Sequence, residues 1–225
     1  RPVYVALTVG PKSYMNLGDN FVQEGLANRI TPFTTTNNGK NGSAKNFDTE
    51  KTYRNVMTRY KFGGLQKKGL YVDETVMRMC YTHRRLFAQL AQELIKEGKY
   101  DKAKKVLDKC LEVLPAYNIP HNYVSGSLDL AECYAILGQQ QKAEQLFNAV
   151  WKNSEQYMDF YLALSGNNFD ISMSDCLREF TIMQECSKIA PLISKTLARK
   201  TDKILQNKFV NYREKGGYVP IQKGK

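Results

Sequence analysis

Residues 90–115, LAQELIKEGKYDKAKKVLDKCLEVLP, return forty positions later as a near copy at residues 130–151, LAECYAILGQQQKAEQLFNAVW. In each copy, apolar residues at helical spacing flank a glycine, Gly98 in the first and Gly138 in the second. The pattern predicts two amphipathic helices joined by a turn in which the glycine is left-handed. Where the two helices cross, we expect these matched positions to be buried: Leu90 and Leu130, Ala91 and Ala131, Leu94 and Tyr134, Ala103 and Ala143, Leu107 and Phe147, and Cys110 and Val150.

This repeat is typical of a tetratricopeptide-type helical hairpin, which stacks on neighbouring hairpins to bury a continuous core. The link from Pro115 to Pro120 explains why the period exceeds the ~34 residues of a regular repeat. We therefore predict a mainly α fold, a tetratricopeptide-like helical-hairpin array with a small N-terminal α/β cap. The expected organisation is a cap at 1–72 with a mobile loop at 34–47, two hairpins at 73–151, C-terminal capping helices at 152–215 and a basic tail at 216–225.

Within the cap, residues 2–9 have the length and composition of a strand that ends at Gly10-Pro11. Asp19 is in a position to cap a short helix that would reach Asn28. Residues 29–33 are expected to return as a second strand beside the first. Asp48 or Thr49 should then begin a helix that reaches Arg59 or Tyr60.

Helix-capping residues mark the rest of the chain. Asp73 should open a helix of more than twenty residues, and the second helix of that hairpin should run from about Tyr100 to Leu114. After the second hairpin, Ser174 and Asp175 are placed to cap a helix, and Pro191 should start or kink the last one.

Composition narrows the possible functions. No apolar run approaches the ~18–20 residues that span a bilayer, so we expect a chain that is soluble as given. The net charge is +11, and residues 195–225 hold nine basic and two acidic residues, a net charge of +7. The chain starts at Arg1, directly before an apolar strand and without an initiator methionine, which indicates that it is cut from a longer protein.

Motifs for catalysis or for metal binding are missing. The sequence contains no H-E-x-x-H, C-x₂-C or G-x-S-x-G motif. We interpret His83 and His121 as structural or surface residues, and the five cysteines as free thiols packed as small hydrophobes. The carboxylates Glu97 and Asp101 lie around an exposed helix turn, where solvation is favoured over a raised pKa. We predict no catalytic, cofactor-binding or metal-binding residue, and so not an enzyme; a dispersed catalytic site is kept as an alternative.

The concave face of a hairpin array is lined by the first helix of each pair, and a protein or glycan ligand could bind there. The candidate groove contacts are Arg85, Gln92, Tyr123 and Glu132, with Ala88 and Ala135 on the same face. The alternative is that this face packs against the N-terminal cap.

The basic tail region combines cations with aromatic residues: Lys208, Phe209, Tyr212, Arg213, Lys215 and Tyr218. Such a set could follow a phosphate backbone, or its lysine stems could cover apolar surface while their charges stay in water. We favour the second interpretation over nucleic-acid binding, and also consider contact with membrane head groups.

The order of segments is more specific than the repeat. RPVYVALTV at 1–9, GLANRITPF at 25–33, YRNVMTRYKFGGL at 53–65 and GLYVDETVMRM at 69–79, followed by the hairpins, resemble the C-terminal soluble region of a Bacteroidetes protein O-mannosyltransferase-like multi-pass membrane family of largely unknown function. The resemblance implies a region on the periplasmic side of the inner membrane, tethered to the membrane domain of its own parent chain. It also implies that any catalytic residues lie in that membrane domain and not in this sequence, and that the basic tail could touch anionic head groups.

These observations lead to one hypothesis and two rivals. The hypothesis is a non-catalytic accessory region of a membrane glycosyltransferase-like protein, which binds a protein or a glycan acceptor through its helical-repeat surface. The first rival is a glycan-binding uptake lipoprotein of the starch-utilisation type, although those proteins are longer and begin with a lipidated cysteine. The second is an enzyme with a dispersed site.

Overall fold

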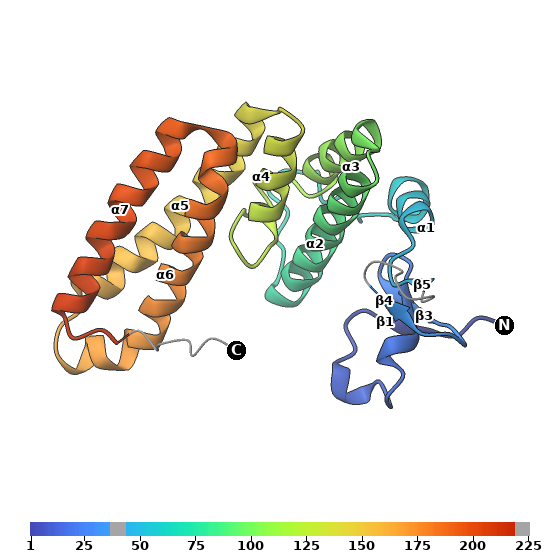
Figure 1. The fold of residues 1–225 in the computed structure, drawn as a ribbon, viewed down its shortest axis with the longest axis horizontal. Coiled ribbons are helices and arrows are strands. Elements are labelled where there is room, and N and C mark those ends of the chain that lie inside the picture. Colours follow the sequence, from blue (N-terminus) through green and yellow to red (C-terminus); the bar gives the residue numbers. More distant parts are fainter. Residues whose placement is uncertain (37–43, 219–225) are drawn as a thin grey trace. The chain divides into compact units, whose positions relative to one another are not determined.

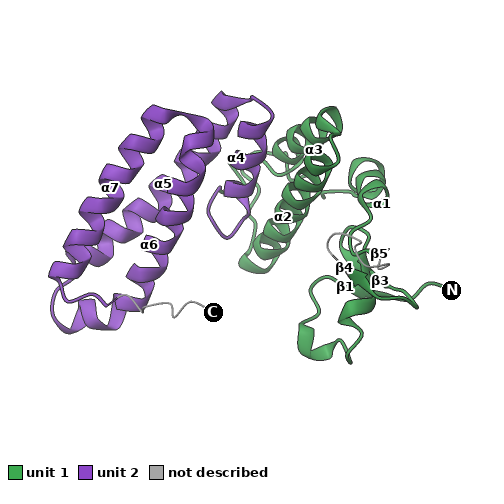
Figure 2. Cartoon of the chain, in the orientation of Figure 1, with its two compact units in different colours: residues 1–120 green, residues 121–225 purple. Residues whose placement is uncertain are grey.

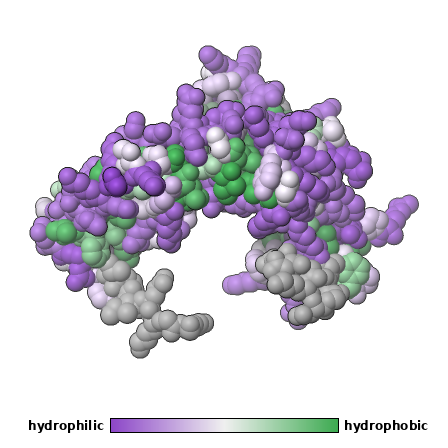
Figure 3. All heavy atoms as spheres, turned by 45° about the horizontal axis from the view of Figure 1, so that its top comes forward, coloured by the Kyte–Doolittle hydropathy of each residue, from purple (hydrophilic) through white to green (hydrophobic). Residues whose placement is uncertain are grey.

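The computed structural model describes residues 1–36 and 44–218 (Figure 1). Over these ranges the chain is mainly helical, and its residues cluster into two compact units, 1–120 and 121–225 (Figure 2). The surface in Figure 3 is mostly hydrophilic with smaller hydrophobic patches. None of the helices in the described ranges is both long and apolar enough to cross a membrane.

The first unit begins with a small antiparallel sheet in the order β1-β3-β2. The expected strand at 2–9 is present but shorter, and the expected second strand pairs with it, beginning two residues earlier than predicted. The predicted helix from Asp19 to Asn28 is wrong, because Gly25 turns the chain back with a φ of +95° and Glu24 N–H donates to the Ala27 carbonyl at 2.8 Å. The strands are β1 (Tyr4–Ala6), β2 (Phe21–Gln23) and β3 (Ala27–Ile30).

The predicted loop after this sheet is ordered at both ends. Two short parallel strands, β4 (Thr35–Thr36) and β5 (Ala44–Lys45), flank residues 37–43, which lie outside the described residues. Downstream of β5 the chain runs beside β2: Gln23 N–H donates to the Asn46 carbonyl at 2.8 Å, and Asp48 N–H donates to the Gln23 carbonyl at 2.9 Å. These backbone bonds fix Lys45, Asn46 and Phe47 against the sheet.

The helix starts predicted at Asp48 or Thr49 and at Asp73 are confirmed. Asp48 accepts a hydrogen bond from Lys51 N–H at 2.9 Å, and Asp73 accepts from Thr75 and Val76 N–H at 2.8 and 3.1 Å. Gly98 has a φ of +72°, as a left-handed helix end requires. The helical elements are α1 (Thr49–Arg54), the single π-helical turn η3 (Asn55–Arg59), α2 (Glu74–Lys96) and α3 (Tyr100–Val113).

All twelve matched repeat positions are 0% exposed, so the core predicted from the repeat is confirmed. The two hairpins that contain them are α2–α3 in the first unit and α4–α5 in the second. The five cysteines are free and buried, also as predicted.

A buried arginine fixes the link that lengthens the repeat. The Arg84 side chain is 0% exposed, and its guanidinium donates to the carbonyls of Leu114, Ile119 and Pro120 at 3.0, 2.7 and 2.8 Å. Burial lowers the pKa of this guanidinium. The Asn118 carboxamide also donates to two carbonyls of the segment before α2 at 2.7 Å each.

In the second unit, residues 121–218 form four helices, of which α5, α6 and α7 lie side by side (Figure 1). The predicted helix start at Ser174 and Asp175 is wrong, because α6 runs unbroken through both. Pro191 neither starts nor kinks the last helix; it lies in the final turn of α6, and Ser194 Oγ caps α7 by accepting from Leu197 N–H at 3.0 Å. The helices are α4 (Ser127–Ile136), α5 (Gln140–Ala163), α6 (Asn167–Ile193) and α7 (Lys195–Glu214).

Candidate functional site

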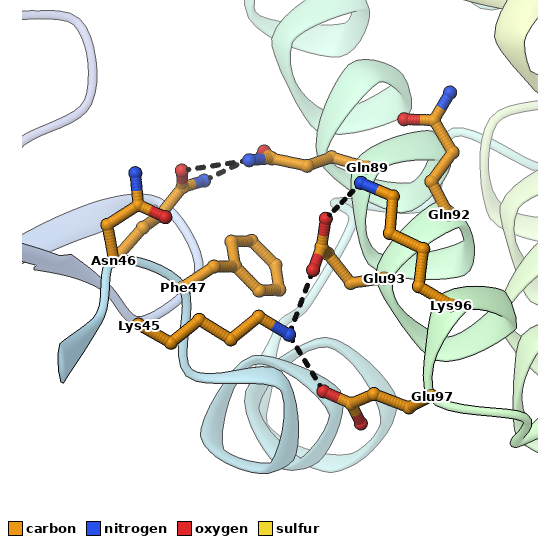
Figure 4. A pocket seen from close by; sticks show the side chains of 9 residues that line it. Lys45, Asn46, Phe47, Gln89, Gln92, Glu93, Lys96 and Glu97 are labelled. Atoms are coloured by element: carbon orange, nitrogen blue, oxygen red, sulfur yellow. Dashed lines mark hydrogen bonds and ion pairs between the residues drawn. The ribbon is translucent and has the colours of Figure 1, made fainter. Parts of the chain in front are cut away.

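One face of α2 and the cap enclose a cavity of about 670 Å³ in the first unit (Figure 4). The cap contributes Gln23 from β2 and the segment 45–47, which the backbone bonds described above hold beside β2. The helix contributes polar side chains at helical spacing: Gln89, Gln92, Glu93, Lys96 and Glu97. The sides of the cavity are therefore polar, and Phe47, 5% exposed, packs between them.

Carboxamides occupy one end of the cavity. Gln23 and Gln89 exchange hydrogen bonds across it, with Nε2 to Oε1 distances of 3.1 and 3.2 Å. Gln23 also donates to the Gly25 carbonyl at 3.1 Å, which fixes its orientation. Gln92 makes no hydrogen bond to the other residues drawn in Figure 4, so within this set its donor and its acceptor are not used.

A network of ion pairs occupies the other end. Lys45 Nζ lies 2.9 Å from both Glu93 Oε2 and Glu97 Oε1, and Lys96 Nζ lies 2.7 Å from Glu93 Oε1. Thr49 Oγ1 donates to Glu97 Oε1 at 2.7 Å. Among the residues that line the cavity, two cations therefore balance two carboxylates, and Lys99 Nζ adds a further contact to Glu97 Oε2 at 2.9 Å.

The network keeps both carboxylates ionised. Burial opposes ionisation of Glu97, but hydrogen bonds from Lys99, Lys45 and Thr49 outweigh it and lower the pKa of the carboxyl to about 2. For Glu93, too, burial is outweighed by its lysine partners, and its pKa is lowered. Neither group would be protonated at neutral pH, so neither is suited to act as a general acid there.

The predicted contacts Arg85 and Gln92 lie on this same face of α2. Arg85 lines a second cavity, of about 390 Å³, together with Leu7 and Thr8 of the cap, and Gln89 lines both cavities. This face of α2 therefore lies against the cap, as in the alternative interpretation, and two cavities remain between α2 and the cap. Ala88 is only 1% exposed and is not available to a ligand.

The other two predicted contacts belong to the second unit. Tyr123 precedes α4 and lines a cavity of about 730 Å³. Glu132 is half-buried on α4, where burial, helped by the charge of Asp129, raises the pKa of its carboxyl. Ala135 is 6% exposed. A groove that joins these residues to Arg85 and Gln92 remains a prediction.

Both histidines are held by the fold. His83 packs edge-on against the rings of Tyr60 and Phe62, and burial lowers the pKa of its imidazole. His121 Nδ1 lies 2.8 Å from Ser127 Oγ at the start of α4. Over residues 1–36 and 44–218, no three histidine, cysteine or acidic side chains gather in a way that could hold a metal ion.

The basic C-terminal side chains pack on their own unit. Lys208 pairs with Asp159, Phe209 stacks on Phe180 with ring centroids 5.2 Å apart, and Lys215 Nζ donates to the Leu164 carbonyl at 2.8 Å. Tyr212 is 0% exposed and donates to the Tyr218 carbonyl at 3.0 Å. These two lysine charges are bonded within the unit, so the interpretation in which lysine stems cover apolar surface while their charges stay in water remains a prediction. Residues 219–225 of the predicted basic tail lie outside the described residues.

Sequence reasoning missed the cap side of the main cavity. Gln23 fell within the wrongly predicted helix, and Lys45 and Phe47 fell within the predicted loop. Gly25 between two short apolar runs is the signal that could have identified the β2–β3 hairpin. No local signal places Lys45 opposite Glu93, because that contact depends on packing between distant segments.

The fold defines a helical-repeat protein. Residues 85–117, which cover most of the first hairpin, match the tetratricopeptide repeat model, and this confirms the predicted repeat class. Residues 1–51, which contain the three-stranded sheet, match the model of TMEM260-associated domain 2. No curated protein and no solved structure matches the chain.

Proposed function

We propose that this chain is a non-catalytic binding region that holds an extended polypeptide through its helical-repeat surface, with the α2–cap cavity as the binding site. The observation that carries the proposal is the pairing of a tetratricopeptide-like helix face with a polar cavity, in which the Gln92 carboxamide makes no hydrogen bond to the other lining residues. Helical repeats build concave surfaces suited to extended partners.

The side chains of the cavity suit a peptide backbone. A carboxamide offers an acceptor oxygen and N–H donors, which can pair with the N–H and the carbonyl of a peptide backbone. Gln92 is free to make this pair of bonds, and Gln23 and Gln89 could exchange their mutual bonds for bonds to a ligand at little cost, because bonds are replaced and not lost. The ion pairs at the other end fix Glu93 and Glu97, so the fit depends on hydrogen bonding more than on net charge.

The parent protein is part of the same proposal. The order of segments at 1–9, 25–33, 53–65 and 69–79 supports an accessory region of a membrane glycosyltransferase-like protein, exposed on the periplasmic side, whose partner is an acceptor polypeptide or the parent's own membrane domain. Ionised and fully paired carboxylates in the cavity support a non-catalytic role. A glycan is the alternative ligand, because sugar hydroxyls also pair with carboxamides.

The test compares peptide and glycan binding by the full chain. We expect peptides on an array of extended sequences to bind, and Gln92→Ala to weaken them about three- to tenfold, since one hydrogen-bonding side chain is removed. Gln141→Ala is the matched control, because Gln141 is an exposed glutamine on α5 that does not line this cavity. Arg85→Glu and Glu132→Lys report whether the surface extends along α2 and into the second unit.

Three results would each overturn a part of the proposal. Peptide binding that is unchanged in Gln92→Ala would remove the cavity as its site. Glycan binding without peptide binding would replace the ligand class, and turnover of a lipid-phosphate sugar by this chain would replace the non-catalytic role.

A further inference from the structure

A second cavity arises from unequal helix lengths in the second unit. α4 has 10 residues and α5 has 24, so at ~1.5 Å per residue α5 extends well past the start of α4. α6 packs along this extension, and a cavity of about 730 Å³ lies between the two helices and the residues that precede α4. The cavity therefore depends on the part of α5 that continues beyond the repeat.

Tyrosine side chains form its walls. Tyr123, before α4, is 41% exposed, and Tyr157, on the extension of α5, is 50% exposed. Ser154 and Ile182, which are nearly inaccessible, also line the cavity. Two tyrosines that leave ring surface open beside a cavity are suited to hold the stem of a long side chain or to face a cation.

A buried carboxylate also lines the cavity. The Glu179 side chain is 8% exposed, and its charge is met by Arg178, whose Nη2 and Nε lie 3.3 and 3.4 Å away. These contacts are long for charge-assisted hydrogen bonds. Arg178 is 61% exposed and makes a shorter contact of 3.0 Å with Asp175, so it is shared between two acids. Glu179 is thus a buried carboxylate whose nearest cation is loosely held and can move into solvent.

The surroundings are acidic although the chain carries a net charge of +11. Burial, together with the charges of Glu185 and Asp129, raises the pKa of the Tyr123 hydroxyl, and Lys188 opposes them. Two carboxylates, Glu185 and Asp129, and one cation, Lys188, therefore act on Tyr123, while the charged residues that line the cavity itself are Glu179 and Arg178.

We propose that this cavity binds a lysine or arginine side chain of a basic polypeptide, with the cationic group at Glu179 and the aliphatic stem between Tyr123 and Tyr157. The cation would replace the long contact that Arg178 makes, and Arg178 would stay paired with Asp175. This site lies in the second unit and is independent of the α2–cap cavity. It defines a partner by a basic side chain, which the proposed function above does not specify.

Binding of a labelled peptide with one central lysine among glycines tests the proposal on the full chain. The comparison peptide has norleucine in place of lysine, which keeps the stem and removes the charge. We expect the lysine peptide to bind at least about tenfold tighter, since a desolvated charge pair is lost with norleucine. Glu179→Gln should remove this difference, whereas Glu144→Gln, at an exposed position on α5, makes the same change in charge and should preserve it.

A gain of affinity separates binding from a purely structural role of Glu179. Arg178→Gln removes the competing cation, and we expect it to tighten the lysine peptide about threefold or more, as expected when a rival for the same carboxylate is removed. Tyr157→Ala should weaken the peptide, and Gln92→Ala should not. Equal binding of the lysine and norleucine peptides would overturn the proposal, and so would weaker binding of the lysine peptide to Arg178→Gln than to the unchanged chain. The absence of peptide binding to both the unchanged chain and Arg178→Gln would overturn it as well.

Discussion

Replacement of Arg84 by methionine tests how the link between the hairpins is stabilised. Methionine keeps the apolar stem and removes the guanidinium, which leaves the carbonyls of Leu114, Ile119 and Pro120 without this donor. The bonds to Leu114 and Ile119 are buried and the bond to Pro120 is partly buried. Since a buried carbonyl that loses its partner costs about 1–3 kcal/mol, the three together would cost about 4–5 kcal/mol. The variant also avoids burying a charge, which offsets part of that cost. We expect a net loss of about 2–4 kcal/mol in the free energy of unfolding.

The neighbouring arginine supplies the control. Arg85 is exposed and its guanidinium donates to Thr82 Oγ1 at 3.2 Å, so Arg85→Met should change stability by no more than about 0.5 kcal/mol. Urea unfolding followed by far-UV circular dichroism gives both values, and amide hydrogen exchange over residues 114–120 locates the effect. If Arg84→Met unfolds within about 1 kcal/mol of the unchanged chain, the three carbonyl contacts are not what holds the link.

Three further results follow from the structure. Gly25→Ala should destabilise the cap by about 2 kcal/mol or more, because alanine is strained at a φ of +95° and its Cβ would overlap the Tyr60 hydroxyl. Gly10→Ala is the control: a Cβ at Gly10 would meet open space, so this variant should be nearly neutral in the same urea titration. The pKa of Glu97 is about 2 in the folded chain, against 4.5 ordinarily, so its ionised form stabilises the fold fully above pH 4.5. As the pH falls toward 2, this contribution of about 1–2 kcal/mol, after solvent screening, is lost from the free energy of unfolding. Glu97→Gln should lack this part of the acid loss, and an identical pH profile of the two proteins would contradict the assignment. The five buried thiols should react with a disulfide reagent only on unfolding, and a fast-reacting thiol in the native chain would count against the packing.

The helical hairpins could be predicted because their signals are local. Leu90 and Leu130 begin the same run of spacings, and that run alone identifies the face that each helix buries. Asp73 and Gly98 mark the ends of α2 by bonds and conformations within one helical turn. These features need no information from the rest of the chain.

The sequence-based predictions are wrong where contacts between distant segments determine the secondary structure. Phe21, Val22 and Leu26 fit helical spacing, but Phe21 and Val22 pair with Ile30 and Arg29 of β3 in a sheet instead. The Leu26 carbonyl accepts a hydrogen bond from Leu7 N–H. Ser174 is a suitable helix cap by composition, yet α6 continues through it, because apolar residues on either side pack as one stripe against α5 and α7. Local preference is therefore outweighed by burial over a longer segment.

Arg84 and Arg85, which are adjacent in the sequence, show the same limit of prediction from local sequence patterns. Arg84 follows Cys80 by four residues and precedes Phe87 by three, so the buried stripe of α2 includes it, whereas Arg85 faces outward. Periodicity thus predicts that Arg84 is buried, but a buried charge demands partners that periodicity does not supply. Those partners are the carbonyl of Leu114 and two carbonyls of the six-residue link, which makes the repeat longer than a regular one.

The candidate site combines both kinds of information. Gln92 could be placed on the ligand-facing side of α2 from helical spacing, but the opposite side of its cavity comes from residues 45–47, which the sequence indicated only as a polar loop. Lys45 reaches Glu93 and Glu97 across this cavity, so a ligand that contacts Gln92 also lies next to the ion pairs that attach the cap to the hairpin. Binding there and the attachment of the cap are therefore coupled: a ligand that competes for Lys45 would loosen the cap, and one that leaves the ion pairs intact would be held between the cap and α2.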